Sequence, residues 1–167
     1  MNPQQLHDYI IKPTLKYMGG NYYSKESAFL LLCTAAIESN CGEYIKQING
    51  PALGVWQMEP DTHFDLWMNS DNLKNADFNL IINNLAPLYC DLKGGKLIDS
   101  PKYACAMARL KYSMDPNPLP KLTGVTSTDL KSFYNYYKLV YNTELGASTY
   151  DKWCIAIAAN HIMKVEL

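Results

Sequence analysis

An almost unbroken apolar run over residues 28–37, AFLLLCTAAI, constrains the fold of this chain more than any other feature. Thr34 is the only polar residue in it, and Gly42 follows soon after. Such a run is typical of a helix that is apolar on every side, and a helix of this kind lies at the centre of a molecule. Because Ser24 is a good N-cap residue and glycine ends helices, we expect a buried helix over residues 24–41.

The rest of the chain shows helical periodicity in several segments and convincing strand alternation in none. We expect further helices over residues 3–17, 60–68, 76–92 and 102–112, one capped by Ser127 or Thr128, and one that begins at Thr149 or Asp151. Residues 42–60 contain several glycines and prolines, so we expect mostly loop there, with a short hairpin around residues 53–58. The sequence therefore predicts a mainly α fold of six or seven helices, with one loop excursion after the buried helix.

Length and charge limit the class of protein. A chain of 167 residues without repeats or linkers suits one domain over residues 1–167. The net charge of −1 argues against binding of nucleic acid by bulk charge. No apolar stretch approaches the about 20 residues that span a bilayer, so we expect no membrane insertion. The first residues lack the basic and apolar regions of a signal peptide, so we expect synthesis in the cytoplasm.

The cysteine and histidine patterns do not indicate a metal site or a disulfide framework. The five cysteines are odd in number and form no C-x-x-C motif, and no two histidines stand at i, i+4. We therefore expect reduced thiols, no metal and no cofactor. The cysteines are Cys33, Cys41, Cys90, Cys105 and Cys154.

Glu38 is the first charged residue after the apolar run and stands near the predicted end of the buried helix. A carboxyl group in surroundings of low dielectric constant keeps its proton more readily, because burial raises its pKa. A glutamate that is protonated near neutral pH can act as a general acid. The alternative is a glutamate that leaves the core at the last helical turn and points into water.

The loop excursion brings further polar groups after Glu38. Gln57 follows nineteen residues later, within the stretch GVWQMEP of residues 54–60. Trp56 offers an aromatic face, Gln57 an amide that both donates and accepts, and Glu59 a second carboxylate. Together with Glu38 they would make a polar cleft. The alternative is an ordinary turn-rich loop with Trp56 in the core.

Glu38-Ser39, then G-x-x-Q at residues 54–57 and then Pro60, resembles the motif of soluble lytic transglycosylases and goose-type lysozymes. Residues 50–63, 103–120 and 136–146 look still more like lysozyme-like proteins of tailed bacteriophages. The resemblance implies a lysozyme-like α fold in two lobes with a cleft between them. It also implies cleavage of the β-1,4 bond between N-acetylmuramic acid and N-acetylglucosamine, without a cofactor.

The resemblance also implies residue roles. Glu38 matches the catalytic general acid and base, Ser39 its helper, and Gln57 the cleft amide. The family places a tyrosine near the catalytic glutamate, and Tyr112 is our candidate, with Tyr103 behind it. The usual A-Y-N run is absent here. The predicted substrate-binding residues are Ser39, Trp56, Gln57, Glu59 and Tyr112. We interpret the aromatic residues of 133–141 as core and lobe interface.

Two routes of cleavage remain open, because the residues flanking Gln57 depart from the commonest transglycosylase run. In the lytic route, which we favour, the substrate's own N-acetyl group assists. Glu38 then takes the proton of the C6 hydroxyl as a 1,6-anhydro ring closes. In the hydrolytic route, Glu59 or Asp65 would position a water. His63, just past the motif, is assigned to capping or packing, with a role in the cleft as the alternative.

The expected partner is a peptidoglycan glycan strand, and the expected setting is a tailed phage or prophage. The protein would act on the cell wall as an endolysin, or be carried in the virion as a lysin beside other virion proteins. The alternatives are a non-catalytic virion structural protein and a carbohydrate-binding module, each with the lysozyme-like fold. The presence of Glu38 and Gln57 favours an enzyme over both.

Overall fold

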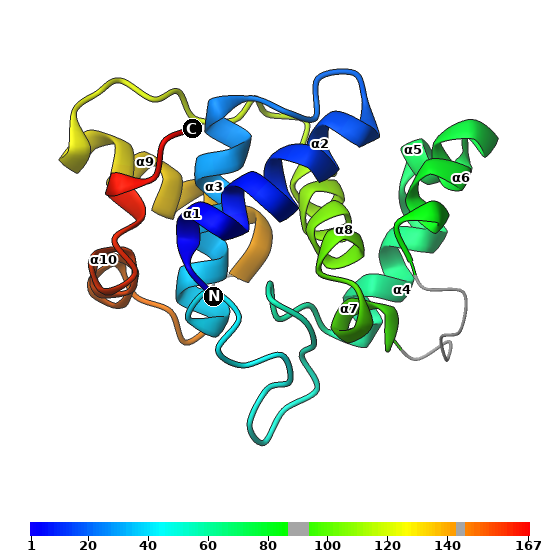
Figure 1. Ribbon diagram of the computed structural model, residues 1–167, viewed down its shortest axis with the longest axis horizontal. Coiled ribbons are helices and arrows are strands. Elements are labelled where there is room, and N and C mark those ends of the chain that lie inside the picture. The colour runs from blue at the N-terminus through cyan, green and yellow to red at the C-terminus, as the bar shows by residue number, and fades with distance from the viewer. Residues whose placement is uncertain (87–93, 143–145) are drawn as a thin grey trace.

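The apolar run forms the core of helix α3 (Lys25–Ser39), around which other helices pack (Figure 1). The structure is a computed structural model that describes residues 1–86, 94–142 and 146–167. Residues 28–36 are all at most 3% exposed, so no face of α3 along this stretch is open to water. Ser24 caps the helix through a reciprocal pair of hydrogen bonds with Ser27, as predicted from its N-cap preference.

The N-terminal helical segment crosses α3 and contains a π-helical part. It consists of α1 (Pro3–Gln5), the π-helical η1 (Leu6–Ile11) and α2 (Lys12–Met18). The π-helical part ends at Ile11, two residues before Pro13, which supplies no backbone N–H to the helical ladder. Gly19 ends the segment with a positive φ of 75°. The prediction of a helix over residues 3–17 is confirmed.

The remaining helices lie on two sides of α3 and α8 (Figure 1). Helices α4 to α7 gather around α8, whereas α9 and α10 pack on α3 and on one another. The prediction of a mainly α fold is confirmed, and the described residues contain no strand. The bounds are α4 (Pro60–Asn69), α5 (Asp71–Lys74), α6 (Ala76–Asn84), α7 (Lys96–Asp99), α8 (Pro101–Ser113), α9 (Thr126–Tyr137), η2 (Lys138–Asn142, π-helical), α10 (Tyr150–Ala159) and η3 (Ile162–Lys164, 3-10).

Two helix boundaries test the predicted caps. The side chain of Thr149 caps α10, as expected. The cap predicted at Ser127 or Thr128 is wrong, because α9 begins at Thr126 after Val125 and has no side-chain cap. The carboxylate of Asp129 in its first turn instead accepts hydrogen bonds from two backbone N–H groups of the preceding loop. The helix predicted over residues 76–92 is helical to Asn84, and residues 87–93 lie outside the described residues.

The excursion after α3 is held by backbone contacts rather than by a regular hairpin. The predicted hairpin reduces to two isolated antiparallel bridges, which pair Leu53 with Lys46 and with Met58. Gly54 has a φ of 75°, and a Cβ atom there would lie 2.3 Å from the carbonyl oxygen of Leu97. Only glycine fits at this approach, so the excursion is fixed against α7.

Four cysteines are free thiols, namely Cys33, Cys41, Cys105 and Cys154, and the fifth, Cys90, lies outside the described residues. Burial raises the pKa of the Cys33, Cys41 and Cys105 thiols, which favours the protonated form. Within residues 1–86, 94–142 and 146–167 there is no group of three metal-ligating side chains. Nor does any helix in these ranges have the length and apolar character needed to cross a bilayer.

Candidate active site

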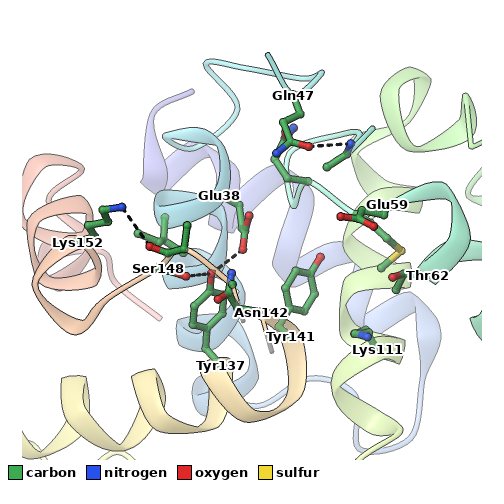
Figure 2. A pocket seen from close by; sticks show the side chains of 16 residues that line it. Glu38, Gln47, Glu59, Thr62, Lys111, Tyr137, Tyr141, Asn142, Ser148 and Lys152 are labelled. Atoms are coloured by element: carbon green, nitrogen blue, oxygen red, sulfur yellow. Dashed lines mark hydrogen bonds between the residues drawn. The ribbon is translucent and has the colours of Figure 1, made fainter. Parts of the chain in front are cut away.

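A cleft of about 640 Å³ opens beside the C-terminal end of α3 (Figure 2). Its walls come from α3, the 42–59 excursion, α4, α8, α9, η2, the segment before α10 and the first turn of α10. Three of the predicted site residues line it, namely Glu38, Gln57 and Glu59. The sequence analysis did not place the other polar lining residues in the site, and these are Gln47, Thr62, Lys111, Tyr137, Tyr141, Asn142, Ser148 and Lys152.

Glu38 stands in the last turn of α3, where the buried helix meets the cleft. Its carboxyl group is partly buried, and its Oε1 accepts a hydrogen bond of 2.6 Å from the hydroxyl of Tyr137. Burial raises the pKa of Glu38 from 4.5 to about 7, although the Tyr137 hydrogen bond opposes the rise. The group therefore holds a proton near neutral pH and can transfer it to an acceptor in the cleft.

Tyr137 is held in a fixed orientation at the end of α9. Its hydroxyl lies 3.0 Å from Oγ of Ser148, and since its hydrogen points to Glu38, the Ser148 hydroxyl is the donor of that second bond. Burial and the neighbouring Glu38 raise the pKa of Tyr137 far above its ordinary value. Tyr137 is thus a permanent donor to Glu38 and takes no part in proton transfer itself.

Tyr141 links the same helical segment to residues 54–57, which we call the motif loop. One turn beyond Tyr137, its hydroxyl donates to the carbonyl oxygen of Trp56 at 2.8 Å. The two tyrosine rings stack with centroids 6.2 Å apart. The end of α9 and η2 therefore holds both Glu38 and the chain just before Gln57 in place. The position of Gln57 relative to Glu38 is thereby fixed.

Ser39 and Trp56 have structural positions instead of the substrate contacts we expected. Both side chains are 1% exposed, and neither lines the cleft. Oγ of Ser39 donates to the carbonyl oxygen of Val55 and accepts from the backbone N–H of Gly42 at 2.8 Å. The indole N–H of Trp56 donates to the carbonyl oxygen of Leu31 at 2.9 Å. The interpretation of Trp56 as an aromatic face for sugar is corrected: its ring anchors the loop to α3.

Gln57 lines the cleft in a strained backbone conformation. Its φ is 45°, which is uncommon for a residue other than glycine, and its side chain is 9% exposed. Nε2 donates to the carbonyl oxygen of Gly54 at 2.7 Å. The amide is oriented by this bond, and its carbonyl oxygen accepts no hydrogen bond from any residue that the structure describes. It is therefore available to a donor on a ligand.

Tyr112 is not the tyrosine that contacts Glu38. It is 1% exposed, and its hydroxyl lies 2.6 Å from Oγ1 of Thr34 in the core. Because Thr34 donates to the carbonyl oxygen of Leu30, Tyr112 donates to Thr34. The contact with Glu38 comes from Tyr137, which the sequence analysis assigned to the core and lobe interface. The stretch 136–146 was noted for its resemblance, and the spacing of Tyr137 and Tyr141 by one turn was the available signal.

The remaining candidates divide between the cleft and its surroundings. Glu59, an exposed residue, lies across the cleft from Glu38 in the view of Figure 2. Asp65 lines a different cavity, and its carboxylate accepts from the side-chain amide of Asn69 at 2.6 Å. His63 is 8% exposed, and its Nε2 lies 2.6 Å from the Tyr103 hydroxyl. Burial lowers the pKa of His63 to about 4, so it is neutral and packs as expected.

The cleft thus combines one glutamate of raised pKa, an oriented tyrosine, an oriented amide and a second, exposed carboxylate. This set can protonate a leaving oxygen and hold polar substituents of a ligand, and it requires no metal ligand. No protein-family model, curated protein or solved structure matches the chain.

Proposed function

We propose that the protein cleaves peptidoglycan glycan strands at the β-1,4 bond between N-acetylmuramic acid and N-acetylglucosamine, with Glu38 as general acid and base. One observation carries the proposal: a glutamate with a pKa of about 7 faces a cleft of about 640 Å³ and is oriented by Tyr137. The resemblance of residues 38–60 to lytic transglycosylases and goose-type lysozymes supports the substrate. Helices on both sides of the cleft support a two-lobed, lysozyme-like arrangement.

In the first step, Glu38 donates its proton to the glycosidic oxygen, and the bond from that oxygen to C1 of the muramic sugar breaks. Positive charge develops at C1 as the leaving sugar departs with the proton. The carboxylate left on Glu38 keeps its hydrogen bond from Tyr137, which stabilises the charge that has just formed. Tyr137 therefore makes proton donation easier without losing its own proton.

The lytic route completes the reaction with the same residue. The C6 hydroxyl attacks C1, the Glu38 carboxylate takes the hydroxyl proton, and a 1,6-anhydro sugar forms. Glu38 is then protonated again and ready for another turnover. This route needs no second carboxylate and no positioned water.

The hydrolytic route would depend on Glu59, because Asp65 lines another cavity. Glu59 is exposed, and no hydrogen bond from a described residue orients its carboxylate. A catalytic base that directs water must be held in place. This difference favours the lytic route, in which the oriented Glu38 acts alone.

The test is digestion of purified peptidoglycan, followed by mass analysis of the fragments. The wild-type protein is expected to release fragments that end in anhydro-muramic acid, one water lighter than hydrolytic products. Glu38→Gln should lose about 10²–10⁴-fold in rate while remaining folded. A folded wild-type protein that releases no fragments would refute the proposal, as would wild-type turnover by Glu38→Gln. Reducing-end muramic acid would replace the lytic route with hydrolysis.

A further inference from the structure

Lys111 stands where two cavities of the molecule meet. It lies in the last turn of α8 and lines the cleft that contains Glu38. It also lines a second cavity of about 420 Å³, which is bounded by α4, the end of α8 and η2. In Figure 2, Lys111 belongs to the wall opposite Glu38. A group bound in the cleft could therefore extend past this ammonium group into the second cavity.

The ammonium group of Lys111 has no partner among the residues described, although the side chain is partly buried. Two other lysines near the cleft, in contrast, have hydrogen-bond acceptors for their ammonium groups. Nζ of Lys138 donates to Asn142 and to the carbonyl oxygen of Gly146 at 2.8 and 2.6 Å, and Nζ of Lys152 donates to the carbonyl oxygen of Ala147 at 3.1 Å. Those two lysines hold the chain before α10 in place, whereas no residue that the structure describes accepts a hydrogen bond from Lys111.

A cation at the end of α8 interacts favourably with the helix dipole, but an exposed lysine would do so equally well. A partly desolvated ammonium group gains most from an anionic acceptor at hydrogen-bonding distance. The cleft itself offers the carboxyl groups of Glu38 and Glu59, and the second cavity offers those of Asp65 and Asp115. None of the four pairs with Lys111, and those of Asp65 and Asp115 accept instead from the side-chain amides of Asn69 and Asn117. The acceptor that completes the site would therefore be brought by the ligand.

We infer that Lys111 is a specificity-determining residue that binds a carboxylate of the substrate at the junction of the two cavities. The inference rests on the proposed function, because an N-acetylglucosamine polymer has the same backbone but only neutral substituents. Peptidoglycan carries carboxylates from two sources: the lactyl group of a muramic sugar without peptide, and the peptide stem where it is attached. Lys111 thus makes the cleft selective for the acidic glycan.

The test compares binding of three oligosaccharides by calorimetry, in a Glu38→Gln background that leaves them uncleaved. The first is chitotetraose in its N-acetylated, neutral form. The second is a peptide-free tetrasaccharide of alternating N-acetylglucosamine and N-acetylmuramic acid, and the third is the same tetrasaccharide with peptide stems. Each is titrated into proteins with Lys111, Lys111→Met and Lys111→Arg. Lys102→Met is the matched control, since Lys102 is an exposed lysine of α8 that lines neither cavity.

Lys111→Met is expected to weaken binding of the acidic ligand by about tenfold or more and that of chitotetraose by less than twofold. Lys111→Arg and Lys102→Met should retain the preference. Loss confined to the peptide-bearing ligand assigns the stem carboxylates, and loss with the peptide-free ligand assigns the lactyl group. Unchanged binding by Lys111→Met, or equal weakening of neutral and acidic ligands, would overturn the inference. The proposed function is judged separately, by release of fragments by the protein that retains Glu38.

Discussion

Replacing Glu38 by Gln tests the electrostatics of the cleft through protein stability, without any substrate. Burial raises the pKa of Glu38 from 4.5 to about 7, so ionising this group in the fold is harder than in the unfolded chain. That difference makes the ionised glutamate unfavourable to the fold by about 3 kcal/mol. Gln has nearly the same shape and keeps a carbonyl oxygen for the Tyr137 hydroxyl, but it does not titrate.

The sign of the effect follows from which state holds the proton. Between pH 4.5 and 7 the folded protein retains the Glu38 proton that the unfolded chain has released. The stability contributed by the neutral carboxyl group is therefore complete below pH 4.5 and is lost as the pH rises through 7. Gln does not ionise, so Glu38→Gln does not lose this stability as the pH rises. Its free energy of unfolding should match that of the wild type near pH 4.5 and exceed it by about 3 kcal/mol at pH 8.

The assay is urea unfolding of both proteins at several pH values between 4.5 and 8. Glu59→Gln is the control, because it removes an exposed carboxylate of the same cleft and should change the free energy of unfolding by less than about 0.5 kcal/mol. A stability difference between wild type and Glu38→Gln that stays constant from pH 5 to 8 would refute the reasoning. Glu38 would then be solvated, and the proposal that it donates a proton near pH 7 would lose its physical basis.

Three further predictions concern residues around Glu38. Tyr137→Phe removes the hydrogen bond that lowers the pKa of Glu38, so the falling limb of the pH–rate profile should shift above pH 7. Tyr112→Phe should leave the profile unchanged, and equal profiles for the two variants would contradict the assignment of Tyr137 as the donor to Glu38. Glu59→Gln and Asp65→Asn should each keep substantial activity on peptidoglycan in a fragment-release assay, and a folded but inactive Glu59→Gln would indicate hydrolysis. Ser39→Ala leaves the Gly42 N–H and the Val55 carbonyl oxygen without their buried partner. The variant should therefore lower the free energy of unfolding by about 1–3 kcal/mol in urea titrations, whereas a Ser39 that faced solvent would give almost no change.

The position of Glu38 could be predicted from the sequence because it depends on local information. An apolar run fixes the buried helix, Ser24 starts it, and the first charge after the run must emerge near its end. The partner Tyr137 could not be predicted in this way. It is separated from Glu38 by 99 residues, and their contact depends on how α9 packs against α3. Periodicity shows which face of a helix is apolar, but it does not show where that helix crosses another.

Trp56 illustrates a second limit. A tryptophan in a glycine-rich loop is equally compatible with a ligand surface and with the core, since its ring is apolar and its N–H needs one acceptor. The deciding feature is the carbonyl oxygen of Leu31, which becomes accessible to the indole only when the loop folds back on α3. No pattern within residues 54–60 reports that contact.

The fastening of the motif loop also has a consequence for mutational scanning. Three successive carbonyl oxygens, those of Gly54, Val55 and Trp56, accept hydrogen bonds from Gln57, Ser39 and Tyr141 respectively. Every residue type carries a backbone carbonyl oxygen, so a substitution at position 55 keeps the acceptor. Stability is instead lost when a donor outside the loop, such as Ser39 or Tyr141, is replaced. A scan confined to the loop would therefore underestimate how strongly these hydrogen bonds hold it, whereas replacing the peptide link after Val55 by an ester would weaken the Val55 acceptor and measure its contribution directly.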